Sequence, residues 1–151
     1  MTEVIFVILD PSSDTQDQVC RMIDGLYTLK TSQVVLMDSN EQAKSMDERL
    51  WTFDLEAFIP HNLIDEPIQP PPPVQIAWST PARRFHTLIH MTEQTALPEQ
   101  VQRYQRVIDL VPADDQLKEI ARQRFKGYRQ QGIPPQTLSF QDFLGQFSTE
   151  S

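Results

Sequence analysis

The chain has 151 residues and a mass of 17.5 kDa, a length typical of one compact domain. Hydrophobic residues make up 39% and charged residues 23%, values well away from those of disordered or membrane-spanning chains. With only four glycines, the sequence contains neither a G-x-G-x-x-G motif nor a Walker A loop, which excludes the usual dinucleotide and nucleoside triphosphate sites.

The net charge and the cysteine content limit which partners the protein can bind and in which cellular compartment it is expected. Thirteen Lys and Arg against twenty-one Asp and Glu give a net charge of −8, so the molecule as a whole repels a phosphate backbone. We therefore expect any contact with nucleic acid to be indirect. A single cysteine, Cys20, excludes an internal disulfide. The N-terminus has an early acid and too short an apolar run for a signal peptide, and we expect a cytoplasmic protein without membrane contact.

Strand and helix patterns alternate along the first half of the chain and recur in the second. Strands are indicated by short apolar runs, and helices by apolar residues that recur every three or four positions. Such alternation predicts a single α/β domain with an open, mostly parallel twisted sheet and helices on both faces. In chain order we expect a strand over 4–9, a helix around 19–27, a strand over 33–37, a helix around 43–50, strands over 74–78 and 87–91, a short helix over 99–106, a strand over 107–111 and a long helix over 114–130.

Local signals mark the boundaries of the first elements. The run at 4–9 is apolar throughout, which predicts a strand buried on both faces. Ser12 and Ser13 are candidate N-caps of the first helix, and Ser39 or Asn40 is the candidate N-cap of the second.

Two stretches lack a clear period. The segment 51–73 ends in four consecutive prolines, which are typical of a polyproline II spacer or, alternatively, of a ligand for an aromatic groove in another protein. After Gly132 the composition shifts to Gln, Ser, Thr and Pro. We therefore expect a domain over 1–132 and a C-terminal extension over 133–151, packed on the domain or partly flexible. Four apolar residues of the extension are spaced like one helix face and either cover a flank of the domain or bind a partner: Phe140, Phe143, Leu144 and Phe147.

Positive charge is concentrated in the long helix predicted at 114–130. From Lys118 to Arg129 there are five basic residues and one acid, a local charge of +4 in a chain of −8. Arg124 falls on the apolar side of this helix, where its stem is expected to pack and its guanidinium to reach solvent or a partner. Beside that side runs a surface that we call the cationic strip, made of Lys118, Arg122, Phe125, Lys126 and Arg129.

The cationic strip has two interpretations. It can be the ordinary solvated face of a charged helix. In an acidic protein it also suits a short acidic peptide, whose carboxylates would meet Arg and Lys while one apolar side chain enters a pocket beside Phe125. Direct binding of nucleic acid would require a longer basic track and several stacking aromatic residues.

A second candidate site is the segment 51–63, which carries large apolar side chains without periodic structure. Trp51 and Phe58 either fill the core of the domain or form an exposed protein-binding patch. His61 alone is a weak signal for a metal. Since the single cysteine and the three histidines show no metal-binding spacing, we expect no metal site and no cofactor.

An enzymatic alternative depends on Asp10 and Asp38. Both follow predicted strands, at the edge where an open α/β sheet binds its ligands, so they could hold Mg²⁺ in a small nucleotide-binding or phosphohydrolase domain. Against this, no glycine lies near either acid, Pro11 stands where a donor N–H would be needed, and aspartate is a common turn residue after a strand. No nucleophile elbow or triad spacing is present, so we expect no catalytic residue.

Two ordered blocks of sequence together resemble the chi subunit of the bacterial DNA polymerase III holoenzyme. The first combines DERLW at 47–51, FIPHNL at 58–63 and VQIAW at 74–78. The second combines VIDLVP at 107–112 with LKEIARQRFKGYR at 117–129. The resemblance covers the chain from the first strand to about Gly132, and it rests on the order and spacing of both blocks.

This resemblance implies a non-catalytic α/β domain that pairs with the psi subunit, joins the clamp loader and binds the acidic C-terminal tail of single-stranded DNA-binding protein. Transferred residue by residue, it implies a psi-binding surface of Trp51, Phe58, Ile59, Pro60 and His61. It implies a tail-binding groove of Val111, Lys118, Arg122, Phe125, Lys126 and Arg129. The helical spacing selects the same strip independently of the family.

The sequence departs from the family pattern in several places. Phe125 stands where tyrosine is usual, which keeps the aromatic face and removes a hydroxyl. His86 stands where the family pattern has an aspartate, so we assign no function to that strand edge. Prolines at 70–73 replace a loop richer in glycine, and the segment 133–151 extends past the usual end of the family.

Overall fold

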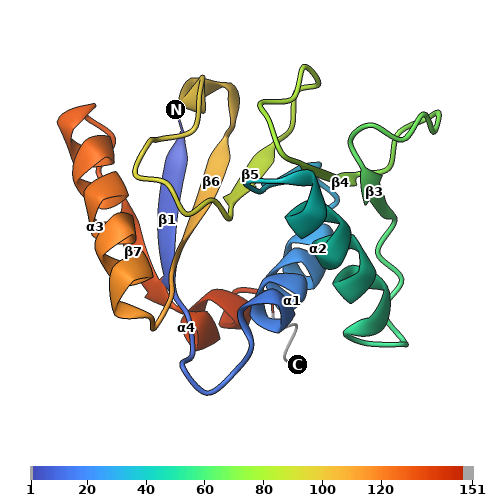
Figure 1. Cartoon of the computed structure of the whole chain (residues 1–151), viewed down its shortest axis with the longest axis horizontal. Coiled ribbons are helices and arrows are strands. Elements are labelled where there is room, and N and C mark those ends of the chain that lie inside the picture. Colours follow the sequence, from blue (N-terminus) through green and yellow to red (C-terminus); the bar gives the residue numbers. More distant parts are fainter. Residues whose placement is uncertain (1, 148–151) are drawn as a thin grey trace.

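The computed structural model describes residues 2–147, which form a seven-stranded sheet with helices on both faces (Figure 1). Every strand is parallel to its neighbours, in the order β3-β4-β2-β5-β6-β1-β7. The predicted open α/β fold is therefore confirmed, with a sheet that is wholly parallel. The strands are β1 (Glu3–Ile8), β2 (Gln33–Leu36), β3 (His61–Leu63), β4 (Val74–Ala77), β5 (Thr87–His90), β6 (Arg106–Val111) and β7 (Gln136–Ser139). The helices are α1 (Thr15–Tyr27), α2 (Asn40–Thr52), α3 (Asp115–Gln130) and α4 (Phe140–Gly145).

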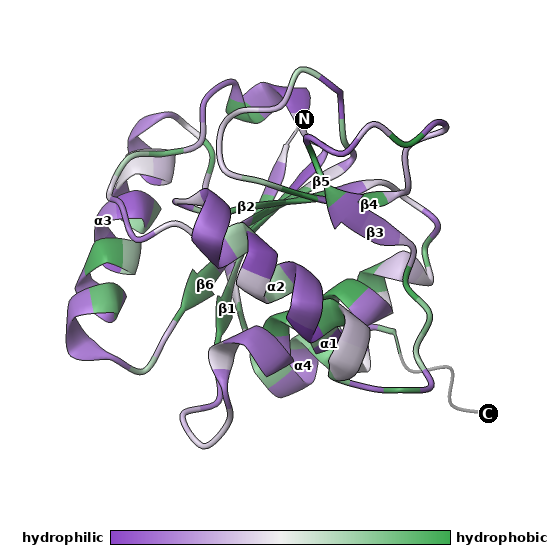
Figure 2. Ribbon diagram, turned by 45° about the vertical axis from the view of Figure 1, so that its right-hand side comes forward, coloured by the Kyte–Doolittle hydropathy of each residue, from purple (hydrophilic) through white to green (hydrophobic). Residues whose placement is uncertain are grey.

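The sheet separates two apolar layers. Helices α1, α2 and α4 cover one face and α3 covers the other (Figures 1 and 2). Side chains alternate along β1, so that Ile5 and Val7 pack in the α1 layer while Val4 and Phe6 pack in the α3 layer. Both faces of the strand are thus buried over most of its length, as its unbroken apolar run predicts.

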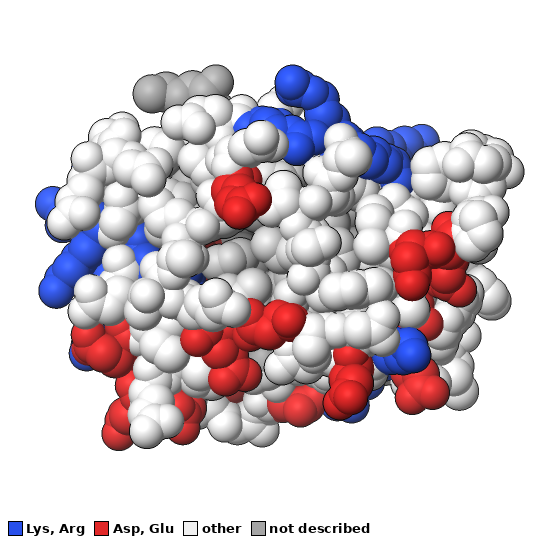
Figure 3. All heavy atoms as spheres, turned by 45° about the horizontal axis from the view of Figure 1, so that its top comes forward, with Lys and Arg blue, Asp and Glu red and all other residues white. Residues whose placement is uncertain are grey.

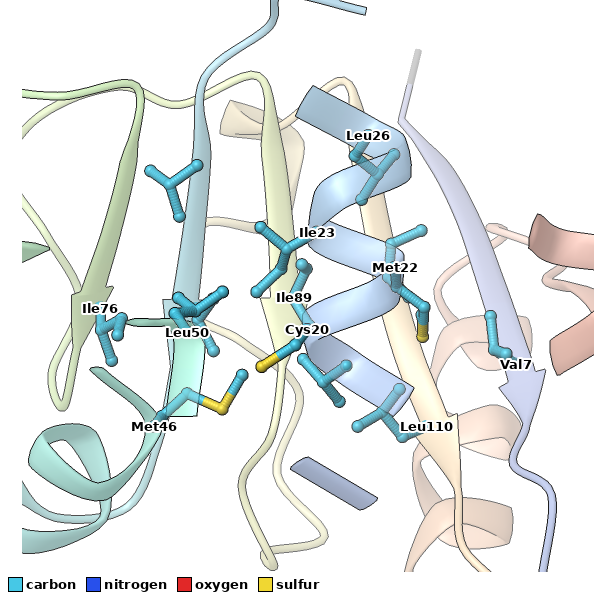
Figure 4. Packing of buried hydrophobic residues seen from close by; sticks show 14 of the residues in the cluster. Val7, Cys20, Met22, Ile23, Leu26, Met46, Leu50, Ile76, Ile89 and Leu110 are labelled. Atoms are coloured by element: carbon cyan, nitrogen blue, oxygen red, sulfur yellow. The ribbon is translucent and has the colours of Figure 1, made fainter. Parts of the chain in front are cut away.

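The layer beneath α1 and α2 is closely packed around fully buried side chains. Figure 4 shows Cys20 and Ile23 of α1 and Leu50 of α2 turned toward side chains from the strands. Burial raises the pKa of the Cys20 thiol to about 12, so this residue is a neutral, packed thiol at physiological pH.

The helix starts confirm one predicted cap and correct another. Ser39 caps α2, because its hydroxyl oxygen accepts a hydrogen bond from the Gln42 N–H at 3.2 Å. The caps predicted for α1, Ser12 and Ser13, are wrong. Ser12 is used in the preceding turn, where its N–H and hydroxyl both donate to Asp10, and Asp14 caps the helix instead.

The prediction of a helix over 99–106 is also wrong, because this segment forms only the single 3₁₀ turn Val101–Arg103. Tyr104 already has extended backbone angles, φ −102° and ψ 141°. The N–H groups of Gln105 and Arg106 both donate to the His86 carbonyl, which draws the chain into β6 before a helix can propagate.

Two strands were not expected from the sequence, and they are the two edge strands of the sheet. β3 has three residues, and β7 has the polar sequence QTLS. In β7, Thr137 lies opposite Phe6 of β1. Because an edge strand has a neighbour on one side only, it needs neither the apolar run nor the β-branched composition that signals a central strand.

The segment after Gly132 adds to the sheet and to the core. β7 pairs with β1, and α4 follows it directly. Phe140 and Phe143 are buried among the side chains of the α1 layer, with Leu144 and Phe147 packed against them. Residue 1 and residues 148–151 of the expected domain and extension lie outside the described residues. Between residues 2 and 147, no helix combines the length and apolar composition needed to cross a membrane.

Candidate functional site

Helix α3 presents a buried side and a charged side, as its periodicity predicts. Asp114 caps the helix by accepting from the Leu117 N–H at 3.0 Å. Ala121, Arg124 and Tyr128 are buried against the sheet. Figure 3 shows one group of Lys and Arg at the left, where α3 lies in Figure 1, and a second group at the top, while acidic residues lie mostly in the lower part of this view.

The buried Arg124 fixes α3 on the sheet. Its Nε donates to both carboxylate oxygens of Asp109, at 3.1 and 2.9 Å, and its Nη2 donates to Oδ1 at 2.9 Å. Its Nη1 donates to the carbonyl of Gln94 at 2.6 Å. The guanidinium therefore finds a partner inside the protein, one of the two outcomes expected for an arginine on the apolar side of the helix.

A groove of ≈ 290 Å³ runs between α3 and the neighbouring strands. We call it the α3 groove. The floor includes Ile8, which ends β1 and remains 46% exposed although it belongs to an inner strand. The alternation along β1 places Ile8 on the same face as Phe6, toward α3. The groove is lined by Phe6, Ile8, Val111, Lys118, Ala121, Arg122, Phe125 and Thr137.

The structure brings four of the six predicted groove residues together. Val111, Lys118, Arg122 and Phe125 line the α3 groove. The other two, Lys126 and Arg129, are not part of its lining. They are exposed on later turns of α3, and no ion pair involves either side chain within residues 2–147.

Phe125 forms an apolar wall at the inner side of the cationic strip. Its ring meets the buried ring of Phe6 edge to face, with centroids 5.1 Å apart. Phe6 makes a second such contact with Tyr128, at 5.9 Å. This stack holds the half-buried ring of Phe125 in place beside the groove.

Arg122 is exposed and only loosely engaged within the chain. Its Nη1 lies 3.3 Å from Glu119 Oε1, one turn earlier in α3. Hydrogen bonds from Gln123 and then Arg122 lower the pKa of the Glu119 carboxyl. Because both partners face water, the pair is weak and an incoming carboxylate could replace Glu119.

Of the groove residues that the sheet supplies, the prediction included Val111 and missed Phe6, Ile8 and Thr137. Ile8 was expected to be buried with the rest of its run, and Thr137 lies in a strand that no pattern indicated. The alternation within β1 puts Ile8 on the α3 face. Ile8 lies opposite Val111 of β6 on one side and Ser139 of β7 on the other, so its exposure follows from its position at the end of β1, where the cover of α3 is incomplete.

The predicted psi-binding segment forms an exposed apolar patch with a buried base. Trp51 is 54% exposed and Phe58 is 80% exposed, which decides between core and surface for these two residues. Leu55, at 81% exposure, extends the patch beyond the predicted residues, and Pro60 is exposed as well. We call Trp51, Leu55, Phe58 and Pro60 the apolar patch.

Ile59 and His61 lie beneath this patch rather than on it. Ile59 belongs to the core, and His61 is buried with its ring against Trp51 at a centroid distance of 4.3 Å. The two ring nitrogens of His61 lie 2.6 Å from the Ile59 carbonyl and 3.2 Å from the Asp47 carbonyl. Burial is the main cause that raises the pKa of the neighbouring Asp47 carboxyl.

Comparison with known proteins identifies the family. The model of the family described as DNA polymerase III chi subunit, HolC, matches residues 1–136. A relative named DNA polymerase III subunit chi from Haemophilus influenzae is 31% identical over 134 residues, covering 87% of this chain and 92% of the relative. Relatives of the same name are 30% identical over 132 residues in Escherichia coli, with 87% and 90% coverage, and 34% identical over 140 residues in Pseudomonas aeruginosa, with 90% and 95% coverage.

The chain belongs to the chi subunit family of bacterial DNA polymerase III. The resemblance inferred from the two sequence blocks is confirmed. Both the cationic strip and the apolar patch lie inside the matched range, whereas β7 lies almost wholly beyond it. In this chi family member, the end of the α3 groove is therefore completed by a strand that the family model barely reaches.

The carboxylates of the two acids in the enzymatic alternative are engaged in hydrogen bonds within the protein, Asp10 in its own turn and Asp38 with a distant loop. The Asp10 carboxylate accepts from the N–H and hydroxyl of Ser12, which lowers its pKa. The Asp38 carboxylate accepts from the Glu93 N–H and the Gln94 amide. Within residues 2–147, no three acidic, histidine or cysteine side chains are grouped as a metal site would require.

Proposed function

We propose that this chi family member is a non-catalytic adaptor of the replisome. One surface would bind the psi subunit, and through it the clamp loader. The α3 groove would bind the acidic C-terminal tail of single-stranded DNA-binding protein. The observation that carries the proposal is the cationic strip bordering an apolar groove in a protein of net charge −8.

The α3 groove has the two features that a peptide end requires. Lys118 and Arg122 at its rim can pair with carboxylates, and the planar guanidinium of Arg122 can donate two parallel hydrogen bonds to one carboxylate. Between them and the sheet, Ile8, Val111 and Phe125 offer an apolar surface for one side chain of the peptide. Lys126 and Arg129 extend the positive charge along α3 for acids further from the peptide end.

The apolar patch supports the psi contact. Three large apolar side chains are exposed within a short segment of the chain, and exposed apolar groups concentrated in this way are typical of a protein interface. Ile59 and His61 would support this interface from below, since the core packing of Ile59 and the ring of His61 beneath Trp51 hold the exposed side chains in position.

Both partners could bind at once, because the two surfaces lie toward opposite edges of the sheet. The apolar patch precedes β3, the first strand in the sheet order, and the α3 groove borders β7, the last. An adaptor that connects two assemblies needs this separation.

Two variants test the proposal as a pair. Phe125→Ala is expected to weaken binding of a labelled acidic tail peptide at least about tenfold and to leave co-purification with psi intact. Phe58→Ala is expected to abolish co-purification with psi and to leave peptide affinity unchanged. Replacing the peptide's terminal carboxylate by an amide should also weaken binding. If Phe125→Ala and the amidated peptide both bind like the originals, the groove assignment is wrong.

A further inference from the structure

A second cavity lies on the other side of α3 and takes no part in the proposed function. Its volume is ≈ 240 Å³, and it shares no lining residue with the α3 groove. We call it the switch-point crevice. It is lined by Thr15, Gln16, Met37, Gln42, Ser45, His90, Met91, Thr92, Glu93, Leu110, Pro112, Leu117, Ile120 and Arg124.

The crevice occupies the position where parallel α/β sheets bind ligands. The strands β2, β5 and β6 are neighbours in the sheet, but the chain leaves β2 toward α2 on one face and leaves β6 toward α3 on the other (Figure 1). Such a reversal is a topological switch point, which opens a crevice beyond the carboxyl ends of the strands. The lining residues come from the ends of β2, β5 and β6, from the N-terminal turns of α1 and α2, and from the side of α3 that faces them.

Two walls of the crevice are apolar. Met37 and Met91 follow the ends of β2 and β5, and Leu117 and Ile120 are half-buried on α3. Methionine side chains adapt readily to the shape of a bound group. An opening bounded by methionines on the sheet side and by branched aliphatic side chains on the helix side suits a ligand with flat apolar faces.

The side formed by α1 and α2 supplies hydrogen-bonding groups without charge. Gln16 and Ser45 are joined by a hydrogen bond of 3.1 Å between Nε2 and Oγ. Gln42 accepts from the Asp38 N–H through Oε1 at 3.1 Å, which leaves its Nε2 group to donate. Together with the Thr15 hydroxyl, these side chains can pair with the polar edge of a ring.

The charges at the crevice disfavour an anion. Arg124, the cation among the lining residues, directs its Nε and Nη2 groups to Asp109 and its Nη1 group to backbone carbonyls. Glu93 lines the crevice, and its N–H donates to the adjacent Asp38 carboxylate. A phosphate or carboxylate would meet these acids without a free cation to balance it.

We propose that the switch-point crevice binds an uncharged, flat heterocycle of nucleobase size. Its faces would lie between the methionines and the aliphatic side chains of α3, and its polar edge would pair with Gln42, Gln16 and Ser45. The cavity is smaller than the 300 Å³ or so at which pockets for drug-sized molecules begin, which limits the ligand to one ring system with small substituents.

The methionine methyl groups test this proposal directly. In the full chain labelled with ¹³C at methionine methyls, Met37 and Met91 report on the crevice, while Met22 and Met46 are fully buried references in the core. Adenosine and guanosine are the probes. We expect one of them to shift the signals of Met37 and Met91 saturably and to leave both references unmoved, and its 5′-monophosphate to bind at least about tenfold more weakly.

Two variants complete the experiment. Ile120→Ala is expected to weaken nucleoside binding about tenfold by removing part of the apolar wall, whereas Ile8→Ala, in the α3 groove, should leave it unchanged. If Ile120→Ala moves the reference signals and is therefore misfolded, Ser45→Val replaces it. Unmoved Met37 and Met91 signals, equal binding of the monophosphate, or undiminished binding in the folded variant would each overturn the proposal. The α3 groove is tested separately with the tail peptide, so the two assignments can fail independently.

Discussion

Two arginines of α3 allow a sharp test of how environment decides the role of a charge. Arg122 and Arg124 lie two residues apart on the same helix. The Arg122 side chain is 66% exposed at the rim of the α3 groove, whereas the Arg124 side chain is 4% exposed and pairs with the fully buried Asp109. We predict that substituting the first affects peptide binding and that substituting the second affects stability.

For Arg124→Leu, the magnitude follows from the partner left behind. The Asp109 carboxylate would keep the Leu110 N–H at 2.8 Å but lose all three hydrogen bonds from the guanidinium. Removing one partner of a buried ion pair costs about 3–5 kcal/mol of stability, out of roughly 5–15 kcal/mol for a whole domain. The double variant Arg124→Leu, Asp109→Asn should regain part of this loss, because no buried charge remains.

For Arg122→Ala, the free energy of unfolding should change by less than about 0.5 kcal/mol, since its pair with Glu119 faces water. Its effect is expected on the acidic tail peptide instead. A lost charge-assisted hydrogen bond weakens binding by about 1.5–3 kcal/mol, and exposure to solvent reduces this to about 1–2 kcal/mol, or roughly tenfold in Kd.

Urea unfolding and peptide titration, applied to both variants at the same ionic strength, measure the two effects. Arg124→Leu should shift the unfolding midpoint strongly without a change in the m-value. Peptide affinity should be measured far below that midpoint, where the variant is still folded. The reasoning is refuted if Arg122→Ala destabilises the protein as much as Arg124→Leu does, or if Arg124→Leu costs less than about 1 kcal/mol.

Three further predictions concern residues that contact these surfaces or the C-terminal segment. Glu119→Ala should raise the affinity for the tail peptide about twofold, because it frees Arg122 from an internal competitor, and unchanged affinity in the same titration would contradict this. Burial raises the pKa of Asp47 in the folded state, so stability should fall as pH rises above about 4, and Asp47→Asn should remove that fall in urea unfolding measured across pH. A Cβ at Gly25 would lie 2.6 Å from the Phe147 ring, so Gly25→Ala should lower the melting temperature in the natural chain but not in a Phe147→Ala background.

Much of the fold could be predicted because the central strands and long helices carry strong local signals. β1 is apolar on both faces, and α3 has a clear helical period that correctly separated Arg124 from its charged neighbours. The predictions failed where contacts between distant parts of the chain determine the local structure. The helix expected at 99–106 does not form because the N–H groups of Gln105 and Arg106 donate to the His86 carbonyl. Strand β7 forms because β1 offers an unpaired edge, although the sequence QTLS has no strand pattern of its own.

The α3 groove likewise has one part that local sequence signals predict and one part that depends on nonlocal contacts. Its cations are spaced along one helix, so their common face follows from the period of the sequence alone. Its floor is assembled from the apolar Ile8 and Val111 and from Thr137, which come from three strands far apart in the chain. No local pattern could place these residues together, since their proximity depends on the register of β1 with β6 and β7.

The difference between the cationic helix face and the floor of the groove matters for which acidic peptides the groove prefers. A cationic helix face alone would attract any acidic segment, because charge interactions at an exposed surface are screened by salt and depend only weakly on geometry. The apolar floor adds a fixed position for one side chain, so a peptide must present its carboxylates and an apolar group at the correct spacing to use both. The discriminating part of the site is therefore the nonlocal part, and substitutions at Ile8 or Thr137 should reduce the preference for one acidic peptide over another more than they reduce the salt dependence of binding.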